Sequence, residues 1–548
     1  MSANIDGVPP ASDATQSAHS GLEYLAASLK TANATQNTQK DHTGYYVPTK
    51  AVGYRLIGQF LEHLELGEPF LSAPPDHLLG QIVFEPHKVR EKGWIVSFNY
   101  ILLSIVSEFD NADEKERFRR NVQLALNDSS IFLEPREASV QAFVLLAMHG
   151  EEYAAPNISW MLLGHACRQA EALGLHVPAP HLSEMHQKQR LCLFWLLFMR
   201  DKSCALAFGR PAFLPTSLYH QVPLPDDESL LKFHPHNRTA LGNTQVHPQV
   251  STFGCHLLRK SFELGKLMGV ILDFIATGGS SETKCELRKK LDAWHAATTQ
   301  ILTQTMDTER AFAAPNHLHE MALGINSLTF QYLHIRVLLL KGDEFSALRL
   351  SSAREAISLL PTMVSNWSSV YNGVIWQLLY FPFTPFFVIF ENIIHHRGPS
   401  TATIQQDLSL LSSTVTYFAD MRSQVRLLAT VCSRLQSAAG AFLQLAQLHI
   451  ANCASSSDLS SSQVQIQGPG ATRSARPDEQ HDHPNQPLDL NMGDVDVANY
   501  LDWLPADMEL DSVRALCENE KGSGGSRRTF DSMFDWFSWD AYYGGVET

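Results

Sequence analysis

Histidines spaced like metal ligands are the first candidates for chemistry in this sequence. His317, His319 and Glu320 lie in a stretch with helical periodicity. A helical zinc-protease site would need a further histidine on the same helix face, but the corresponding residue is Leu323. Three other histidine pairs lack a neighbouring cysteine or a suitably spaced carboxylate: His234 and His236, His395 and His396, His481 and His483. The sequence therefore predicts no metal site and no cofactor.

Three consecutive acidic residues, Asp226, Asp227 and Glu228, suggest a second chemistry, because clustered carboxylates bind divalent cations. The cluster is similar to that of all-α terpene cyclases, so one alternative is an all-α metal-dependent enzyme of that type. The acids follow Pro223 and Pro225 in a polar segment, however, and this setting predicts a surface loop. A phosphate-binding glycine loop with lysine and a nucleophile elbow are both absent from the sequence. We expect no catalytic residues, and a non-catalytic adaptor is a further alternative.

The overall charge argues against a protein that binds nucleic acid through a broad basic face. The 548 residues carry a net charge of −15, and 44% of them are apolar, which suffices for a sizeable core. Residues 485–548 contain 13 Asp and Glu against 4 Lys and Arg, a balance of −9. The acidity is therefore concentrated at the C-terminal end. A chain of this length predicts two or more units, or one large domain with tails.

Cysteine usage and hydropathy predict an intracellular soluble protein without a membrane partner. The N-terminus shows neither the basic nor the apolar region of a signal peptide. The longest apolar stretch, Trp376 to Phe390, is interrupted by Pro382 and Pro385, and we expect it to be too short to span a bilayer. The eight cysteines lie far apart and should be reduced, mostly buried thiols: Cys167, Cys192, Cys204, Cys255, Cys285, Cys432, Cys453 and Cys517.

The rest of the chain must be arranged around the stretch from residue 187 to residue 225. Nine consecutive apolar residues, Leu191 to Met199, stand between Arg190 and the charged group formed by Arg200, Asp201 and Lys202. A run that is apolar on every side predicts a helix buried on every side. Glycine and proline at 209 and 211 predict that the chain leaves this helix in a turn.

Apolar periodicity elsewhere predicts an all-α fold. The spacing i, i+3, i+4, i+7 recurs along the chain, and no alternating run indicates a strand. In the helix that precedes the central one, we expect Asn157 or Ser159 as N-cap and Gly174 as the C-terminal stop. The segments expected to be helical are 57–64, 94–109, 118–126, 140–148, 159–173, 253–277, 284–306, 316–341, 346–361, 374–396 and 428–446.

Composition divides the chain into four predicted parts. Residues 1–44 are polar and are expected to be disordered. Residues 45–452 form a large irregular helical domain. Residues 453–487 form a disordered linker, and residues 488–548 form an acidic-aromatic tail.

The central stretch resembles the fungal-specific transcription factor domain, the middle regulatory region of fungal binuclear-zinc-cluster regulators. The similarity is carried by the segments 170–176, 190–201, 207–211 and 222–225, and the best-matching core is 137–225. The resemblance implies an all-helical regulatory domain in a nuclear transcription regulator, with a biosynthetic gene cluster as one option for its target. The family motif, to which we assign a structural role, comprises Gly174, His176, Arg190, Phe194, Trp195, Asp201, Gly209, Arg210 and Pro211.

The sequence departs from that family in one respect. Members usually begin with six cysteines that bind two zinc ions and read DNA, whereas the first cysteine here is Cys167. No DNA-binding residue is identified. We expect the protein to reach DNA through a DNA-bound partner or through a zinc cluster missing from this chain, and a homodimer is the other expected assembly.

Acidic and aromatic residues alternate in the tail. Between Phe530 and Tyr543 there are seven aromatic residues and three aspartates, and a helix would place Phe530, Met533, Phe534 and Phe537 on one face. This is the anchor spacing of a short helix that binds a hydrophobic groove. Transcription machinery or a co-activator is the expected partner, and docking onto the protein's own body is the alternative. The predicted partner-binding residues are Trp503, Leu504, Phe530, Met533, Phe534, Trp536, Phe537 and Trp539.

Several charged residues near the motif have simpler structural explanations. Arg210 is expected to pair with Asp201 or Asp226, and His176 to be a residue of the helix terminus. A small-effector pocket beside the central helix remains an alternative role for the motif. The basic run Arg288 to Lys290 is expected to be a solvated helix face rather than a nuclear-import signal.

Overall fold

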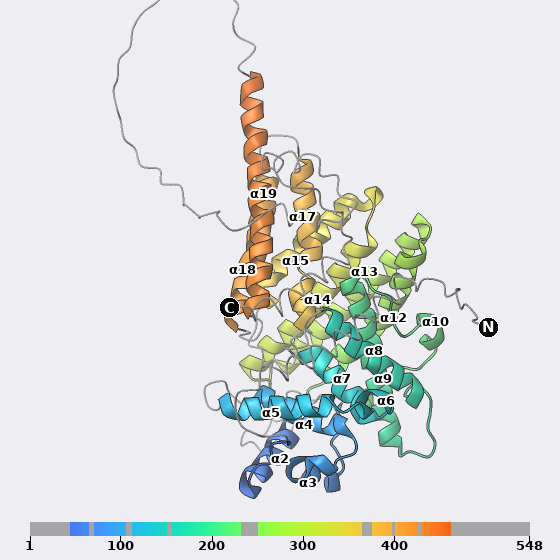
Figure 1. The fold of residues 1–548 in the computed structure, drawn as a ribbon. Coiled ribbons are helices and arrows are strands. Elements are labelled where there is room, and N and C mark those ends of the chain that lie inside the picture. Colours follow the sequence, from blue (N-terminus) through green and yellow to red (C-terminus); the bar gives the residue numbers. More distant parts are fainter. Residues whose placement is uncertain are drawn as a thin grey trace, which may run out of the picture. The chain divides into compact units, whose positions relative to one another are not determined.

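The computed structural model describes residues 44–64, 71–105, 112–150, 156–231, 250–363, 375–396, 401–424 and 429–461. These residues form helices joined by turns, and no strand occurs among them (Figure 1). The predicted all-α fold is confirmed. Residues 1–43, most of the predicted linker and the whole acidic-aromatic tail lie outside the described residues.

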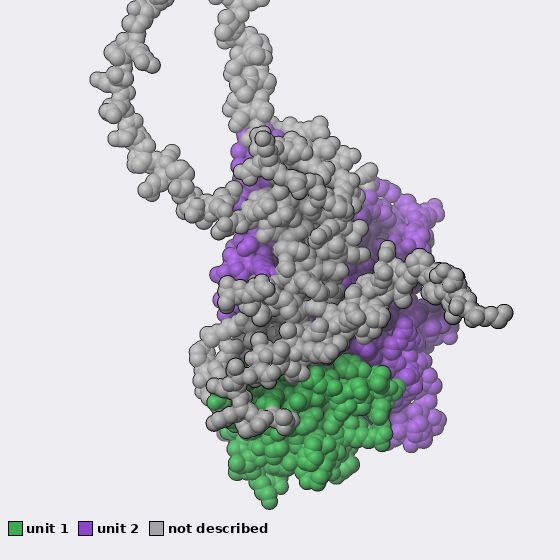
Figure 2. Space-filling view, in the orientation of Figure 1, with its two compact units in different colours: residues 1–65, 71–143 green, residues 66–70, 144–548 purple. Residues whose placement is uncertain are grey.

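The chain divides into two compact units, coloured separately in Figure 2. Unit 1 comprises residues 1–65 and 71–143, and unit 2 comprises residues 66–70 and 144–548. The division falls inside a helix, α7 (Glu137–His149). The predicted helical body, residues 45–452, therefore includes parts of both units.

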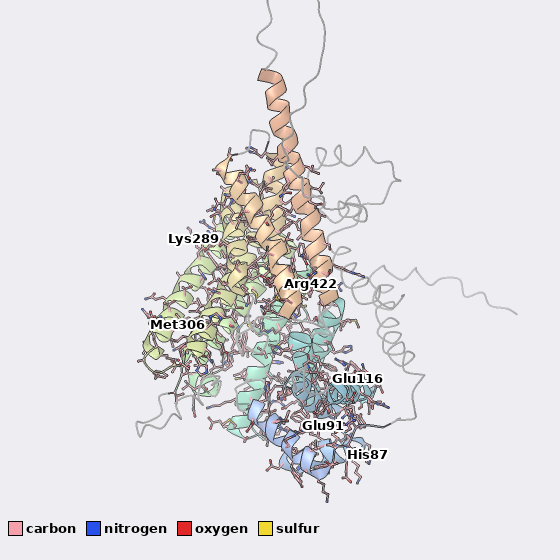
Figure 3. The ribbon with its side chains drawn as sticks, turned by 90° about the vertical axis from the view of Figure 1, so that its left-hand side faces the viewer. His87, Glu91, Glu116, Lys289, Met306 and Arg422 are labelled. Atoms are coloured by element: carbon pink, nitrogen blue, oxygen red, sulfur yellow. The ribbon has the colours of Figure 1, made fainter. Side chains whose placement is uncertain are left out.

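Unit 1 is built on two long helices that pack against each other, α4 (Lys92–Ile105) and α5 (Ala112–Leu126). A Cβ on Gly93, at the start of α4, would lie 2.4 Å from the backbone of Ala138, so glycine permits this close approach. Glu91 accepts a hydrogen bond from Trp94 Nε1 at 3.1 Å, and its side chain is labelled in Figure 3. The remaining elements are α2 (Lys50–Leu64), α3 (Asp76–Phe84), η1 (Pro86–Lys88) and α6 (Ser130–Leu133).

The first half of unit 2 surrounds the central helix, α9 (Glu184–Phe208). Sixteen of its residues are buried, Cys192–Met199 and Asp201–Phe208, which confirms the prediction of a helix buried on every side. α9 packs most extensively on α8 (Pro156–Leu173) and α12 (Phe253–Thr277). A Cβ on Gly265 of α12 would lie 3.2 Å from Met199 Cα, so the two helices approach closely. The exit segment, residues 209–225, contains the short helix α10 (Thr216–Tyr219), and a second short helix, α11 (Asp227–Leu230), follows it.

The second half of unit 2 consists of longer helices, and most of them were expected. α18 (Ala402–Gln424) was not predicted, although its packing with α19 (Ala429–Ser461) is the most extensive helix contact in unit 2. α19 continues to Ser461, beyond residue 452, where the sequence places the end of the helical body. The other elements are α13 (Ser281–Glu309), α14 (Pro315–Leu339), η4 (Asp343–Phe345), α15 (Ser346–Met363), α16 (Ile375–Tyr380) and α17 (Phe383–His395).

The basic run on α13 lies where the sequence suggested. Lys289 and Lys290 are exposed, and Lys289 lies at the edge of the molecule in the view of Figure 3. Arg288 is only partly exposed. The run is therefore a solvated helix face, as predicted.

Within the described residues, one stretch, Trp376–His395, is long and apolar enough to cross a membrane. We expected a shorter stretch, Trp376 to Phe390, interrupted by proline; the length was wrong, because the apolar stretch continues to His395, but the interruption at Pro382 is present. In the structure a turn at Phe381 and Pro382 divides it into α16 and α17, and 78% of its apolar window is buried inside the protein. Trp376 Nε1 donates a hydrogen bond to the carbonyl of Ala147 at 3.1 Å, so the stretch is part of the core of unit 2.

The two ends of α8 differ in how well the sequence predicted them. The helix begins at Pro156, so the prediction of Asn157 or Ser159 as N-cap was wrong. Proline is favoured at the first helical position because it lacks the N–H that would have no partner there. At the other end Gly174 has φ 61°, and the N–H of Leu175 donates to the carbonyl of Ala170 at 3.1 Å. This bond confirms the predicted glycine stop.

Candidate functional site

The Asp201 side chain binds the backbone of the segment that follows α9. Its carboxylate accepts hydrogen bonds from the backbone N–H groups of Phe213, at 2.8 Å, and Leu214, at 3.0 Å. Asp201 is only 2% exposed. A buried carboxylate needs such donors, because water cannot solvate it. The segment after Gly209 is thereby folded back against the helix from which it leaves.

Lys202 completes a buried ion pair with Asp201. Its ammonium lies 2.9 Å from Asp201 Oδ2, donates to the carbonyl of Leu214, and sits 4.5 Å from the centre of the Phe198 ring. Lys202 is 1% exposed. This pair was not predicted from the sequence, although the adjacent charges at the end of an apolar run could have indicated it.

Arg190 binds the C-terminal end of α8. One guanidinium nitrogen donates to the carbonyl of Leu173 at 2.7 Å and to that of Gly174 at 3.2 Å. The last carbonyls of a helix have no partner within the helix and carry partial negative charge. Arg190 therefore joins the start of α9 to the end of α8 at the glycine stop.

His176 packs among aromatic residues immediately after that stop. Its ring centre lies 5.3 Å from that of Phe194 and 5.0 Å from that of Tyr219. The Tyr219 hydroxyl donates to Glu171 at 2.7 Å. Burial lowers the pKa of His176, and the charge of Glu171 partly opposes this shift. His176 thus lies at the helix terminus, as predicted.

Trp195 connects α9 to the end of the exit segment. Its Nε1 donates to the carbonyl of Pro223 at 2.7 Å. Lys266 of α12 places its ammonium 4.6 Å from the centre of the Trp195 ring and donates to the carbonyls of His220 and Val222, both at 3.2 Å. Both ends of the exit segment are therefore bound to buried side chains of α9.

The glycine–arginine–proline turn packs on α8. Gly209 has φ 61°, and the N–H of Arg210 donates to the carbonyl of Ala205 at 3.1 Å, which ends α9. The Arg210 guanidinium lies 4.9 Å from the centre of the Trp160 ring. Trp160 Nε1 also donates to the carbonyl of Pro211 at 3.5 Å. The expected pairing of Arg210 with Asp201 or Asp226 is not the arrangement found, since these acids bind other groups.

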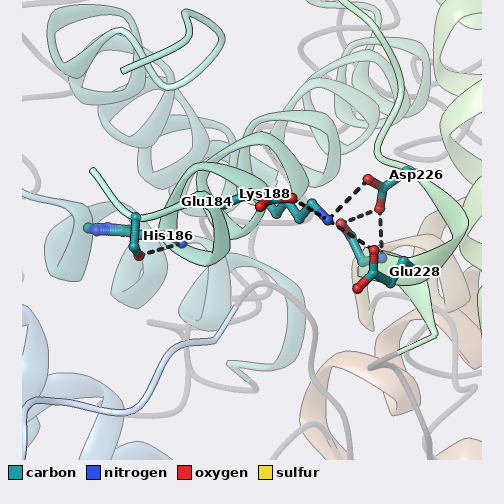
Figure 4. A network of polar contacts seen from close by, with 7 residues as sticks. Glu184, His186, Lys188, Asp226 and Glu228 are labelled. Carbon is teal, nitrogen blue, oxygen red and sulfur yellow. Dashed lines mark hydrogen bonds and ion pairs between the residues drawn. The ribbon is translucent and has the colours of Figure 1, made fainter. Parts of the chain in front are cut away.

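The acidic cluster interacts with basic side chains of the protein itself (Figure 4). Lys188 places its ammonium 3.4 Å from Asp226, 3.2 Å from Glu228 and 3.0 Å from Glu184. Asp226 also caps α11 through the N–H of Ser229, and the hydrogen bonds from Ser229 together with Lys188 lower its pKa.

The third acid of the cluster, Asp227, pairs with Arg259. The described residues contain no group of three or more His, Cys, Asp or Glu arranged to hold a metal ion. The geometry of the cluster is thus that of a surface ion-pair network, and the terpene-cyclase alternative finds no support.

A second buried carboxylate, Asp407 of α18, was not anticipated from the sequence. Arg354 of α15 binds it with two hydrogen bonds, of 2.6 and 2.8 Å, and Asn392 of α17 donates to it at 2.9 Å. The hydrogen bonds with Asp407 raise the pKa of Arg354. This network joins three helices and has no local sequence signature.

The geometry therefore shows a motif in which the side chains bind backbone groups and aromatic rings of the same unit. Residues 104–296 match the family described as the fungal specific transcription factor domain. The chain contains this domain. The match includes the predicted core, residues 137–225, and extends beyond it at both ends, so the resemblance inferred from the sequence is confirmed.

Comparisons with individual proteins agree with the domain match. A transcriptional regulator of Claviceps purpurea is 24% identical over 487 residues, covering 87% of this chain and 73% of its own. A transcriptional regulatory protein of Schizosaccharomyces pombe is 23% identical, covering 68% of this chain and 60% of its own. The Fusaridione A cluster transcription factor of Fusarium heterosporum is 22% identical, covering 47% of this chain and 49% of its own. No solved structure matches the chain.

These relatives are fungal transcription regulators by name, and the chain spans between about half and three quarters of their length. The predicted partner-binding residues of the tail, Trp503 to Trp539, lie outside the described residues.

Proposed function

We propose that this protein regulates transcription in a fungus, with its helical body as a regulatory and protein-interaction module and its acidic-aromatic tail as the activating segment. The observation that carries the proposal is the fungal specific transcription factor domain at residues 104–296. Likeness to a cluster transcription factor of Fusarium heterosporum favours a biosynthetic gene cluster as the target. A nuclear location follows from this role.

The body has a structural role in this proposal and performs no chemistry. Support comes from the side chains of the motif, because Arg190, Asp201 and Trp195 bind backbone carbonyl or N–H groups of the same unit. The acids that could have held a metal ion bind Lys188 and Arg259 instead. A small-effector pocket beside α9 remains a separate hypothesis.

The tail supplies contacts with transcription machinery or a co-activator. The negative charges of Asp531, Asp535 and Asp540 repel one another, and this repulsion keeps the neighbouring aromatic residues solvated. Binding to a groove with a basic rim would neutralise these charges and bury the aromatic residues. Phe534 and Phe537, with Trp536 between them, are the central anchors of such a contact. DNA is reached through a DNA-bound partner or through a zinc cluster outside the given sequence.

A reporter assay tests this proposal. Residues 485–548 are fused to an unrelated DNA-binding domain, and transcription of a reporter gene is measured at equal protein level. We expect activation from the fusion and background output when Phe534, Trp536 and Phe537 are all replaced by alanine. Replacing Ser532 and Ser538 by alanine is the matched control and should leave activation intact. An inactive but well-expressed fusion would remove the activator role.

A further inference from the structure

One side of α12 packs closely on its neighbours in unit 2, and another side keeps apolar residues at the surface. A Cβ on Gly265 would lie 3.2 Å from Met199 Cα of α9, and a Cβ on Gly269 would lie 2.5 Å from Thr216 Oγ1 of α10. These two glycines mark the side of α12 that faces the core. The surface side is of interest in the C-terminal turns of the helix.

Leu267, Val270 and Phe274 form an apolar row on that surface side, which we call the α12 strip. Their spacing of three and four residues places them along one helix face. Val270 is 45% exposed, and Leu267 and Phe274 are partly exposed. Ile275, at the edge of the strip, is 46% exposed. Single exposed apolar residues are ordinary, whereas a contiguous row of them indicates a contact surface.

Two opposite charges flank the α12 strip on the same side. Lys266 and Asp273 are seven residues apart, which is about two helical turns, so they share one flank. Val270 lies between them, four residues after the lysine and three before the aspartate. Asp273 is exposed, and no described residue pairs with its carboxylate. Lys266 donates to the carbonyls of His220 and Val222, which leaves one of its three N–H groups available.

This arrangement is complementary to a second copy of itself. When two identical helices pack antiparallel about a two-fold axis, residue i of one copy meets residue j of the other, and j meets i. With the axis at Val270, that residue meets its own counterpart, and Leu267 meets Phe274. The same register places Lys266 within one residue, about 1.5 Å of helix rise, of the level of Asp273 in the other copy. Two ion pairs can then form, and the strip brings no two like charges together.

We propose that the α12 strip is an interface between two copies of this chain, packed antiparallel about a two-fold axis at Val270. Apolar contacts lie at its centre, and a pair of Lys266 with Asp273 lies on the flank at each end. Charge complementarity selects this occupant, because only a second copy presents the opposite charges at matching positions on both sides of the apolar centre.

A homodimer is one of the assemblies expected from the sequence, and the α12 strip gives it a surface. The inference concerns assembly and goes beyond the proposed function, so it stands or falls independently of the reporter assay. A contact of about three helical turns is smaller than a standard stable interface, and the dimer should therefore dissociate on dilution.

Sedimentation equilibrium of the full chain over a concentration series tests the proposal. We expect a reversible equilibrium between monomer and dimer. Asp273→Lys places like charges opposite each other at both ends of the strip and should raise the dissociation constant about tenfold. Val270→Glu buries a carboxylate at the centre of the contact and should raise it further. A wild-type chain that stays monomeric throughout the series would overturn the proposal.

The matched control is Leu448→Glu, which makes the same kind of change at a residue of α19 that is 50% exposed. This variant should dimerise like the wild type. Because all three positions are at the surface, the urea unfolding midpoints of the variants should equal that of the wild type. A folded Val270→Glu variant that dimerises as tightly as the wild type would also overturn the proposal.

Disulfide cross-linking tests the register of the two helices. The Val270→Cys variant carries its new thiol on the two-fold axis, where closely packed antiparallel helices bring the two Cα atoms within reach of a disulfide. Oxidation with diamide should join two copies through position 270, as identified by mass spectrometry. Leu448→Cys is the control and should give no product linked through position 448. A dimeric Val270→Cys variant without this cross-link would contradict the proposed axis.

Discussion

Unit 2 contains two buried carboxylates, Asp201 and Asp407, and both are bound by donors of the protein. They differ in how far along the sequence these donors lie. Asp201 binds Lys202 and the N–H groups of Phe213 and Leu214, all within 13 residues. Asp407 binds Arg354, 53 residues away, and Asn392 on a third helix. Both are at most 2% exposed.

The comparison shows what kind of polar contact a sequence can reveal. Asp201 stands in a contiguous motif, because the loop that it binds follows directly after its own helix. Asp407 acquires its partners only when α15, α17 and α18 pack together, so no local pattern marks it. Whether the two carboxylates also contribute differently to stability can be measured.

The largest effect is expected for Asp201→Ala. This change leaves Lys202, 1% exposed, without its counter-ion and removes the acceptor of two backbone N–H groups. We expect a loss of about 3–5 kcal/mol in the free energy of unfolding, measured by urea denaturation. Lys202→Met is the control and should cost less, because Asp201 keeps both N–H donors. A loss below that of Lys202→Met would contradict this arrangement.

Asp407→Ala is expected to cost less, about 2–3 kcal/mol. The partner left behind, Arg354, has a side chain that is 28% exposed and can turn toward water. Urea denaturation of the two alanine variants under the same conditions gives the comparison directly. If Asp407→Ala proved more damaging than Asp201→Ala, burial of the remaining cation would not be the deciding factor.

His334 is a buried polar residue without a charged partner, and its effect on stability should depend on pH. Burial lowers the pKa of His334 to about 3, and its ring stacks 3.8 Å from that of Phe381. Its pKa is lower in the folded than in the unfolded state, so stability is retained above about pH 6.5 and lost as pH falls toward 3. Between pH 7 and pH 5 this histidine should cost about 2 kcal/mol.

The variant His334→Phe should lose that part of the pH dependence. Unfolding free energies of the variant and the wild type, each measured at both pH values, give the difference. Parallel pH profiles would show that His334 is not the responsible group.

The smallest effect is expected at the exposed acidic cluster. Asp227 pairs with Arg259, and the side chain of Asp227 is 63% exposed. Exposed pairs contribute little, so Asp227→Asn should change the free energy of unfolding by less than about 0.5 kcal/mol. Reporter output should also be unchanged. A large loss of function in this variant would revive a chemical role for the cluster.

Local rules predicted the parts of this fold that depend on neighbouring residues. The buried central helix and the glycine stops at Gly174 and Gly209 follow from apolar runs and from the backbone freedom of glycine. Contacts between distant segments were missed, and so was α18, which packs against α19. Lys202 was missed because its burial depends on the fold of the loop after α9.

Reporter output from the full chain, fused to an unrelated DNA-binding domain, tests most directly whether the body is architectural and the tail activates transcription. The variant with Phe534, Trp536 and Phe537 replaced by alanine should lose activation at an unchanged protein level and an unchanged unfolding midpoint of the body. Activation retained at the wild-type level in this variant would contradict the account.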